Sequence, residues 1–244
     1  MPVSDLTRPG GGAWNLKGRI NWKKSKIATF EGEQVIQVNH DKNSGTSAHR
    51  GVGGISITAV PRGFPRTEGG AVVSFDVYFP AGWKWAKGGK FGGVGIGTEP
   101  ASGGRHNDRG ASNRVMWQTD GGVILYIYPP SGAKQVAPAL ASARAYGNGV
   151  FNAEFARALK IGQWNTIELG TKLNTFSGSN PNADGAGSLT VNGRTEVIDR
   201  VIWRRFPDLK LEAFDLGVFF GGPDPSPVDQ HAYYKNFRVY EWKD

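Results

Sequence analysis

The chain has no cysteine, which excludes disulfide bonds and thiol chemistry and leaves the redox compartment unreadable from the sequence. It also lacks an apolar run long enough to span a membrane, and its first ten residues do not contain the apolar stretch of a signal peptide. A protein of this kind that acts outside its cell would leave by another route, or the chain is a piece of a longer one.

Several catalytic patterns are missing as well. Glycosidic hydrolysis usually needs two facing carboxylic acids, and the nearest pair, Glu212 and Asp215, has the wrong spacing for one strand face. There is no nucleophile elbow and no phosphate-binding loop. The four histidines are scattered: His40, His49, His106 and His231. We therefore expect neither a metal site nor a cofactor.

What the sequence does contain favours an all-β fold. It has 36 glycines, 14 prolines and 13 phenylalanines with only 20% charged residues, a composition typical of many short strands and tight turns. Ala28 to Val38 is predicted as one such strand. We expect residues 1–12 to be a lead-in or linker remnant and residues 13–244 to form a single domain. The predicted architecture is a β-jelly-roll sandwich of two antiparallel sheets, with a concave substrate groove on one sheet.

The formal net charge of +8 indicates attraction to polyanions, a class that includes nucleic acids, anionic membranes and acidic polysaccharides. Tryptophans are interleaved with the cations, and such aromatic rings suit sugars as well as bases. The cations are Lys17, Arg19, Lys23, Lys24, Lys26, Lys84, Lys87 and Lys90, and the tryptophans are Trp14, Trp22, Trp83 and Trp85. Because no nucleic-acid-binding motif is recognisable, charge alone supports that partner. We expect an acidic polysaccharide, with no nucleic acid and no membrane.

The stretch from Ser112 to Tyr128 is predicted to be an antiparallel hairpin. Two alternating runs flank Asp120-Gly121-Gly122, and Asp-Gly and Gly-Gly readily supply the positive φ angles of a tight reversal. Alternation then separates an apolar face from a polar one. The polar face carries Ser112, Arg114, Met116, Gln118, Ile124, Tyr126 and Tyr128. Such a face on rigid strands is suited to hold a polar, anionic ligand.

A glycine-rich segment precedes the hairpin, and Lys90 stands at its centre. Glycine weakens the interior of a strand, so this segment is expected to bend or to be approached closely by another backbone or a ligand. Composition alone favours a solvated lysine in such a place. Its glycine surroundings make Lys90 a candidate for a functional group.

Lysine, arginine and paired tyrosines suit β-elimination in a uronic acid polymer. In this reaction the C5 proton is removed, the C5 carboxylate is neutralised and the C4 oxygen leaves, so cations stabilise the added negative charge. A tyrosine can move the proton, because its reference pKa of about 10 falls when a cation lies close by. We expect higher activity at mildly alkaline pH than at acidic pH.

Three motifs together resemble the polysaccharide lyases of family fourteen, which include alginate and glucuronan lyases of molluscs and of viruses that infect algae. The motifs are Lys87-Gly88-Gly89-Lys90-Phe91-Gly92-Gly93, Ser112-x-Arg114-x-Met116-Trp117 and Tyr126-x-Tyr128. Segments near the end of the chain, Phe219 to Gly222 and Tyr234 to Val239, are similar too. The resemblance implies a jelly roll that cleaves glucuronate- or mannuronate-containing chains by elimination.

The resemblance also implies catalytic roles for Lys90, Ser112, Arg114, Tyr126 and Tyr128. Arg114 and Lys90 would hold and neutralise the carboxylate, a tyrosine or Lys90 would move the proton, and Ser112 would orient the sugar or a tyrosine.

Two further residues, Gln118 and His106, are candidates to line the groove and bind substrate. We expect a monomer acting outside the producing cell or on the algal cell wall. The alternative is a non-catalytic carbohydrate-binding module for acidic polysaccharides that uses the same groove.

Overall fold

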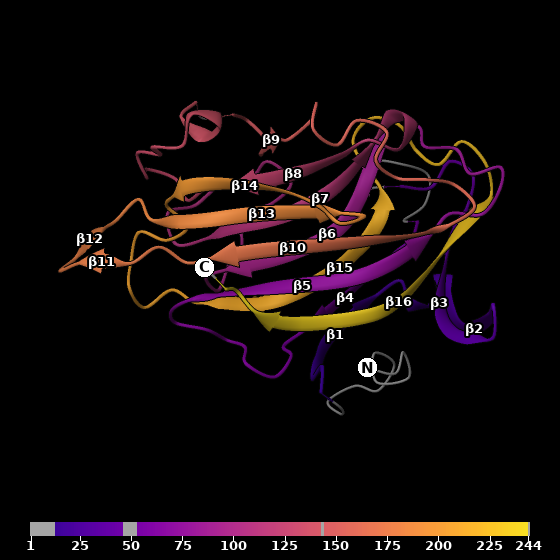
Figure 1. The fold of residues 1–244 in the computed structure, drawn as a ribbon, viewed down its shortest axis with the longest axis horizontal. Helices are drawn as coiled ribbons and strands as arrows, with labels where there is room; N and C mark the ends of the chain where they lie inside the picture. Colours follow the sequence, from indigo (N-terminus) through magenta and orange to yellow (C-terminus); the bar gives the residue numbers. More distant parts are fainter. Residues whose placement is uncertain (1–12, 46–52, 143, 244) are drawn as a thin grey trace.

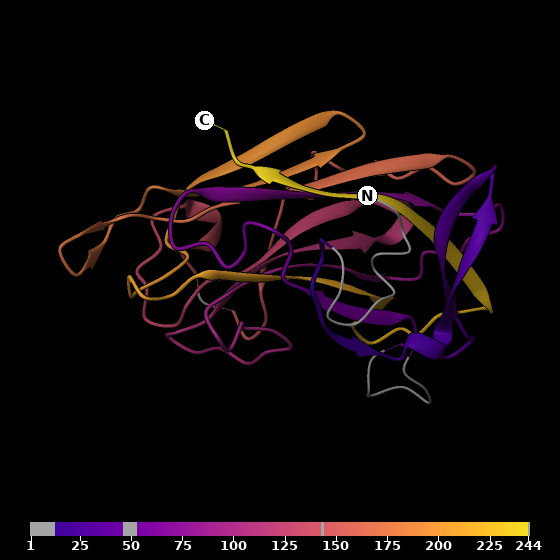
Figure 2. The same cartoon turned by 90° about the horizontal axis from the view of Figure 1, so that it is seen from below.

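The computed structural model describes residues 13–45, 53–142 and 144–243, and these form two large sheets packed face to face (Figures 1 and 2). Figure 2 shows the two layers edge-on, one above the other. All the strand pairings between neighbours in the two sheets are antiparallel. The prediction of an all-β jelly-roll sandwich is confirmed. Residues 1–12, expected to be a lead-in, lie outside the described residues.

The first sheet carries the predicted hairpin. In spatial order its strands are β1 (Leu16–Ile20), β4 (Ile55–Ala59), β15 (Leu211–Phe220), β6 (Gly88–Ile96), β7 (Ala111–Gln118), β8 (Val123–Tyr128) and β9 (Asn148–Val150). Strands distant in sequence therefore lie side by side, because β15 separates β4 from β6. This order brings the end of the chain against the lysine-bearing strand.

The second sheet forms the other layer. Its strands, again in spatial order, are β14 (Arg194–Val201), β13 (Gly185–Val191), β10 (Trp164–Lys172), β5 (Gly70–Tyr78), β16 (Gln230–Glu241), β3 (Glu33–His40) and β2 (Ser25–Phe30). A small two-stranded ribbon pairs β11 (Phe176–Ser177) with β12 (Asn180–Pro181). There are also short 3₁₀ helices, among them η2 (Trp22–Lys24), η3 (Thr119–Gly121) and η4 (Pro138–Leu140).

One hydrophobic core fills the space between the sheets and includes residues from Trp14 to Phe237. Alternation along each strand supplies it, as on β5, where Val73, Phe75 and Val77 are almost fully buried. Burying one apolar face of each sheet leaves the outer face of the first sheet free to hold polar side chains.

Candidate active site

The predicted hairpin is formed by β7 and β8, with η3 as its turn. Asp120 and Gly121 adopt positive φ angles of 57° and 76°, as expected for an Asp-Gly reversal. The register pairs Ser112 with Tyr128 and Arg114 with Tyr126. Arg114 and Tyr126 are therefore directly opposite each other on the outer face of the first sheet.

The other face of the hairpin packs into the core. Trp117, Leu125 and Ile127 have no exposed surface, and Val115 and Val123 are 1% exposed. The division into an apolar and a polar face is therefore confirmed, and burial of the apolar face holds the polar side chains on rigid backbone.

Lys90 reaches the polar face of the hairpin. It lies on β6 directly opposite Met116 of β7. Its Nζ donates to the Met116 Sδ at 2.9 Å and lies 4.5 Å from the centre of the Tyr126 ring. A strand pairing and a cation–π contact thus bring the lysine to the tyrosine.

The glycines around Lys90 make this close packing possible. A Cβ at Gly89 would lie 1.9 Å from the Trp117 ring, and one at Gly92, where φ is +91°, would lie 1.8 Å from the Asp215 carbonyl oxygen. A bulge interrupts the β6–β7 register between Lys90 and Gly92. The segment was predicted to be approached closely by a backbone or a ligand, and the neighbouring backbone of β15 does approach it.

Burial changes the acid–base properties of Lys90. Removal from water is the main cause that lowers the pKa of Lys90 to about 8, and the positive charge of Arg114 lowers it further. A lysine with a pKa of about 8 is neutral in about a tenth of molecules at pH 7 and in about half of them at pH 8. Lys90 can therefore accept a proton under mildly alkaline conditions.

Arg114 is held from two sides. Its Nε donates to the Ser112 Oγ at 3.0 Å, and its Nη1 lies 3.9 Å from the Asp215 Oδ2 on β15. The two side chains meet across Gly93, which pairs with both Arg114 and Asp215. A Cβ at Gly93 would come within 2.9 Å of the Arg114 Cγ, so only glycine leaves the arginine its path. The guanidinium keeps its charge although burial lowers its pKa.

Two members of the expected groove floor are buried. Ser112 is 0% and Tyr128 is 2% exposed, because the loop of residues 97–110 covers this end of the hairpin. The Ser112 Oγ donates to the Ala101 carbonyl oxygen at 2.6 Å, and the Tyr128 hydroxyl accepts from the Gly104 N–H at 3.4 Å. The expectation of an open row of four polar side chains is therefore wrong for Ser112 and Tyr128. Ser112 contacts Arg114 rather than a tyrosine.

The tyrosines differ from expectation in their chemistry. The rings of Tyr126 and Tyr128 lie edge to face at 5.4 Å. Burial, the charge of Tyr128 and the hydrogen bond to it raise the pKa of Tyr126 well above its usual value. The predicted lowering of the phenol pKa by a nearby cation is wrong for Tyr126, because desolvation and Tyr128 raise that pKa although the Lys90 Nζ lies over the ring.

The protein-family model described as polysaccharide lyase 14 matches residues 28–237 of this chain. This match covers most of the chain and includes every candidate site residue. The chain belongs to the polysaccharide lyase 14 family.

Individual relatives agree with the family match. Alginate lyase vAL-1 from Chlorella virus is 48% identical, with a TM-score of 0.93 over 98% of this chain and 97% of that one. A variant of alginate lyase Aly36B solved with an alginate tetrasaccharide is 25% identical, with a TM-score of 0.70 over 99% and 89% of the two chains. Exolysin of Paramecium bursaria Chlorella virus 1 is 29% identical over 70% of this chain, which spans only 29% of exolysin.

The two residues predicted to bind substrate, His106 and Gln118, lie at opposite ends of the hairpin. His106 is exposed, its ring 5.2 Å from that of Tyr128, and its Nε2 lies 3.3 Å from the Ala145 carbonyl oxygen. Gln118 ends β7, and its amide donates to the neighbouring Trp117 carbonyl oxygen at 3.1 Å. His106 therefore adjoins the paired tyrosines, whereas Gln118 adjoins the strand end beyond Met116.

Sequence reasoning missed two residues of the site. Asp215 had been considered only as half of a hydrolytic pair, and Ser56 had not been considered. The Ser56 Oγ donates to the Asp215 Oδ1 at 2.7 Å, and burial raises the pKa of Asp215 against the opposing effects of Ser56 and Arg114. Strand order in the first sheet brings them together, and no local pattern in the sequence indicates it.

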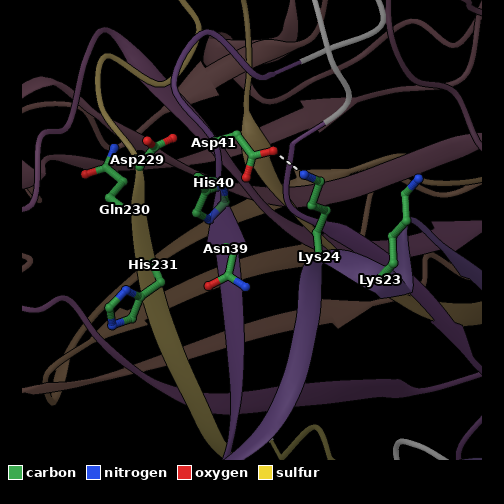
Figure 3. A pocket seen from close by; sticks show the side chains of 8 residues that line it. All are labelled: Lys23, Lys24, Asn39, His40, Asp41, Asp229, Gln230 and His231. Atoms are coloured by element: carbon green, nitrogen blue, oxygen red, sulfur yellow. Dashed lines mark hydrogen bonds and ion pairs between the residues drawn. The ribbon is translucent and has the colours of Figure 1, made fainter.

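A cavity of about 400 Å³ opens elsewhere in the molecule (Figure 3). It is lined by Lys23, Lys24, Asn39, His40, Asp41, Asp229, Gln230 and His231. Its polar groups are largely paired with one another or with nearby backbone, as in the Lys24–Asp41 ion pair and the Gln230 contacts with Lys84. None of the predicted site residues lines it, and the chemistry described above lies on the outer face of the first sheet.

Two searches of the described residues bear on other site types. Among residues 13–45, 53–142 and 144–243, no group of three or more His, Asp or Glu side chains could hold a metal ion. No helix in the same residues is long and apolar enough to cross a membrane.

Proposed function

We propose that this chain cleaves uronic acid polymers by β-elimination. The C5–H bond breaks and its proton passes to a base, the electron pair forms the C4–C5 double bond, and the C4–O bond breaks. The leaving oxygen takes up a proton, so one fragment gains a hydroxyl and the other an unsaturated uronate end. No oxidant or added water is needed for the balance.

The observation that carries this proposal is Lys90, a half-buried lysine with a pKa of about 8 on β6, the strand beside the one that bears Arg114. Arg114 neutralises the C5 carboxylate, whose charge would otherwise oppose carbanion formation. Neutral Lys90 is the base, because the raised pKa of Tyr126 disfavours its phenolate. Protonated Lys90, or the hydroxyl of Tyr126, over whose ring Lys90 lies, returns a proton to the leaving oxygen.

The remaining candidate residues position the reacting groups or bind the polymer. Ser112 is buried and contacts the guanidinium, so it positions Arg114. Tyr128 packs against Tyr126 and holds its ring upright at the groove. His106 and Gln118 mark the two ends of the face along which the polymer binds.

The substrate class is supported by the relatives. Alginate lyase vAL-1 is similar over almost the whole chain, and the Aly36B variant binds an alginate tetrasaccharide. Glucuronan and alginate both carry the carboxylate that Arg114 requires, and we propose that the chain acts on one or both. Similarity to a Chlorella virus exolysin supports action on an algal cell wall, outside the cell that produces the protein.

The test is to incubate the protein with polymannuronate, polyguluronate and polyglucuronate and to follow the ultraviolet absorbance of the new double bond. We expect product from at least one polymer, and none from Lys90→Ala. Lys243→Ala is the matched control, because Lys243 follows β16 of the opposite sheet and should keep full activity. Binding of all three polymers without product from any would instead identify a non-catalytic binding module.

A further inference from the structure

A carboxylate lies on the same face of the first sheet as Arg114 and Tyr126. Asp215 stands in the same cross-strand row as Arg114 and Tyr126, because Gly93 pairs with Arg114 on one side and with Asp215 on the other. The row continues from Asp215 to Thr58 on β4. Asp215 is therefore on the outer face of the sheet, two strands from Arg114, with only Gly93 of β6 between the two side chains.

Asp215 is accessible and only partly engaged. Its side chain keeps 31% of its surface exposed, with Oδ1 accepting from the Ser56 Oγ at 2.7 Å and Oδ2 lying 3.9 Å from the Arg114 Nη1. A carboxylate offers about four lone-pair positions. Both oxygens therefore retain acceptor capacity toward the groove.

On the same side of β15 as Asp215, Gly217 has no side chain, and its backbone is covered by its neighbours Asp215 and Phe219. Gly217 lies two residues further along β15, and a Cβ there would point to the same side, 3.4 Å from the Asp215 Oδ2. Gly217 pairs with Ser56, which pairs in turn with Ile20 of β1. Ile20 is 64% exposed and provides an apolar rim at the edge of the sheet.

Electrostatics alone would disfavour an acid at this point. A uronate carboxylate bound to Arg114 is repelled by a second carboxylate a few ångströms further on, which weakens binding of the polymer. The acid therefore needs another interaction to offset the repulsion. Sugar hydroxyls provide it, because a charged acceptor forms stronger hydrogen bonds than a neutral one, and 1,4-linked uronates leave their C2 and C3 hydroxyls free.

We propose that Asp215 is a specificity-determining residue that accepts hydrogen bonds from the C2 and C3 hydroxyls of a uronate next to the one held by Arg114. Ser56 holds the carboxylate in place, and Gly217 and Ile20 accommodate the ring. This inference rests on the proposed lyase function. Asp215 would thereby discriminate against polymers whose C2 and C3 hydroxyls are blocked.

The test compares acetylated polyglucuronate, substituted at O2 and O3, with the same polymer after deacetylation. The unmodified protein should show a kcat/KM at least about tenfold higher on the deacetylated polymer. Asp215→Asn keeps the shape of the side chain but removes its charge. It should lose roughly 10- to 100-fold in kcat/KM on the deacetylated polymer, mainly through KM, and much less on the acetylated one. The preference between the two polymers would then shrink.

Asp199→Asn on β14 of the opposite sheet is the matched control for charge and should leave the preference unchanged. If Asp215 served only to position Arg114, Asp215→Asn would lower activity on both polymers by the same factor, and that result would overturn the inference. Circular dichroism of Asp215→Asn shows whether the fold is kept, and tetrasaccharide binding measured by calorimetry in a Lys90→Ala background then measures the loss of affinity. A failed lyase proposal would look different, with no product from the unmodified protein on either polymer.

Discussion

Lys90 shows how one side chain acquires its reactivity from position alone. In water a lysine is almost fully charged at neutral pH, and a cation cannot take a proton. Glycines on both sides let β7 and β15 close around it, and the resulting burial lowers its pKa to about 8. Arg114 adds to this effect while remaining charged itself, so that in the proposed reaction one cation holds the substrate and the other is the base.

This pKa predicts the pH dependence of the reaction. The base form of Lys90 is the minor form below about pH 8 and the major form above it, so kcat/KM should rise about tenfold per pH unit at acidic pH and level off above pH 8. Steady-state rates on a polyuronate at constant ionic strength measure the profile. Circular dichroism at each pH serves as the control for folding. An optimum near pH 5 would show that a group other than neutral Lys90 is the base.

At the scale of elements, local patterns predicted the parts and the strand order assembled them. Alternation around Asp120-Gly121 indicated the hairpin, because both the turn chemistry and the face separation are local. The prediction of a single strand from Ala28 to Val38 is wrong. Glu31 and Gly32 both have positive φ angles there and form the turn between β2 and β3. Glutamate in such a turn gives little signal in the sequence.

The missed parts of the site depend on long-range pairing. Asp215 reaches Arg114 only because β15 is inserted between β4 and β6, and no pattern within either strand specifies that order. Ser112 was expected in the groove because its position on the strand is right. It is buried because a polar loop, which reaches it through Ala101, folds back over that end.

The glycines of the first sheet give a prediction for these elements. Gly93→Ala should abolish activity and destabilise the fold, because its Cβ would lie 2.1 Å from the Asn113 carbonyl oxygen and 2.6 Å from the Arg114 Cα. Gly217→Ala should fold normally, since its nearest neighbours would lie at 3.4 and 3.5 Å. It should nevertheless raise KM severalfold, because the methyl group projects beside Asp215.

Thermal unfolding and steady-state kinetics of the two variants check this pair. Gly18→Ala, on the edge strand β1 with nothing within 4 Å of the added methyl group, is the control for a harmless substitution. Equal stability of the Gly93 and Gly217 variants would contradict the packing argument. An unchanged KM in Gly217→Ala would contradict the placement of a sugar ring beside Asp215.

At the scale of the whole molecule, the sandwich gives its two sheets different tasks. The first sheet carries the reactive face, and the second covers its back and shields the core. The two layers also meet at a buried histidine. His40 comes from β3 of the second sheet, and its ring packs against Trp83, Trp117 and Phe220 at 5.3 to 6.5 Å. The packing of His40 therefore helps to hold the two sheets together.

His40 predicts how the fold responds to acid. It is 1% exposed, and neither ring nitrogen has a hydrogen-bond partner among the described residues. Burial lowers the pKa of His40 to about 3; Asp41 partly opposes this effect, and His231 adds to it. The folded protein thus keeps His40 neutral while the unfolded chain binds a proton below pH 6.5. The contribution of neutral His40 to the free energy of unfolding is fully present above pH 6.5. It is lost as the pH falls towards 3, at about 1.4 kcal/mol per pH unit.

Urea unfolding at pH 7, 5.5 and 4 measures this loss. His40→Gln cannot take up the proton, so its free energy of unfolding should fall less steeply with acid than that of the unmodified protein. His106→Gln, at an exposed position, should keep the original slope and controls for the loss of a histidine. Should His40→Gln not fold, an NMR titration of His40 in the unmodified protein decides the matter. A ring that titrates near pH 6.5 would show that the packing of the two sheets does not exclude its charge.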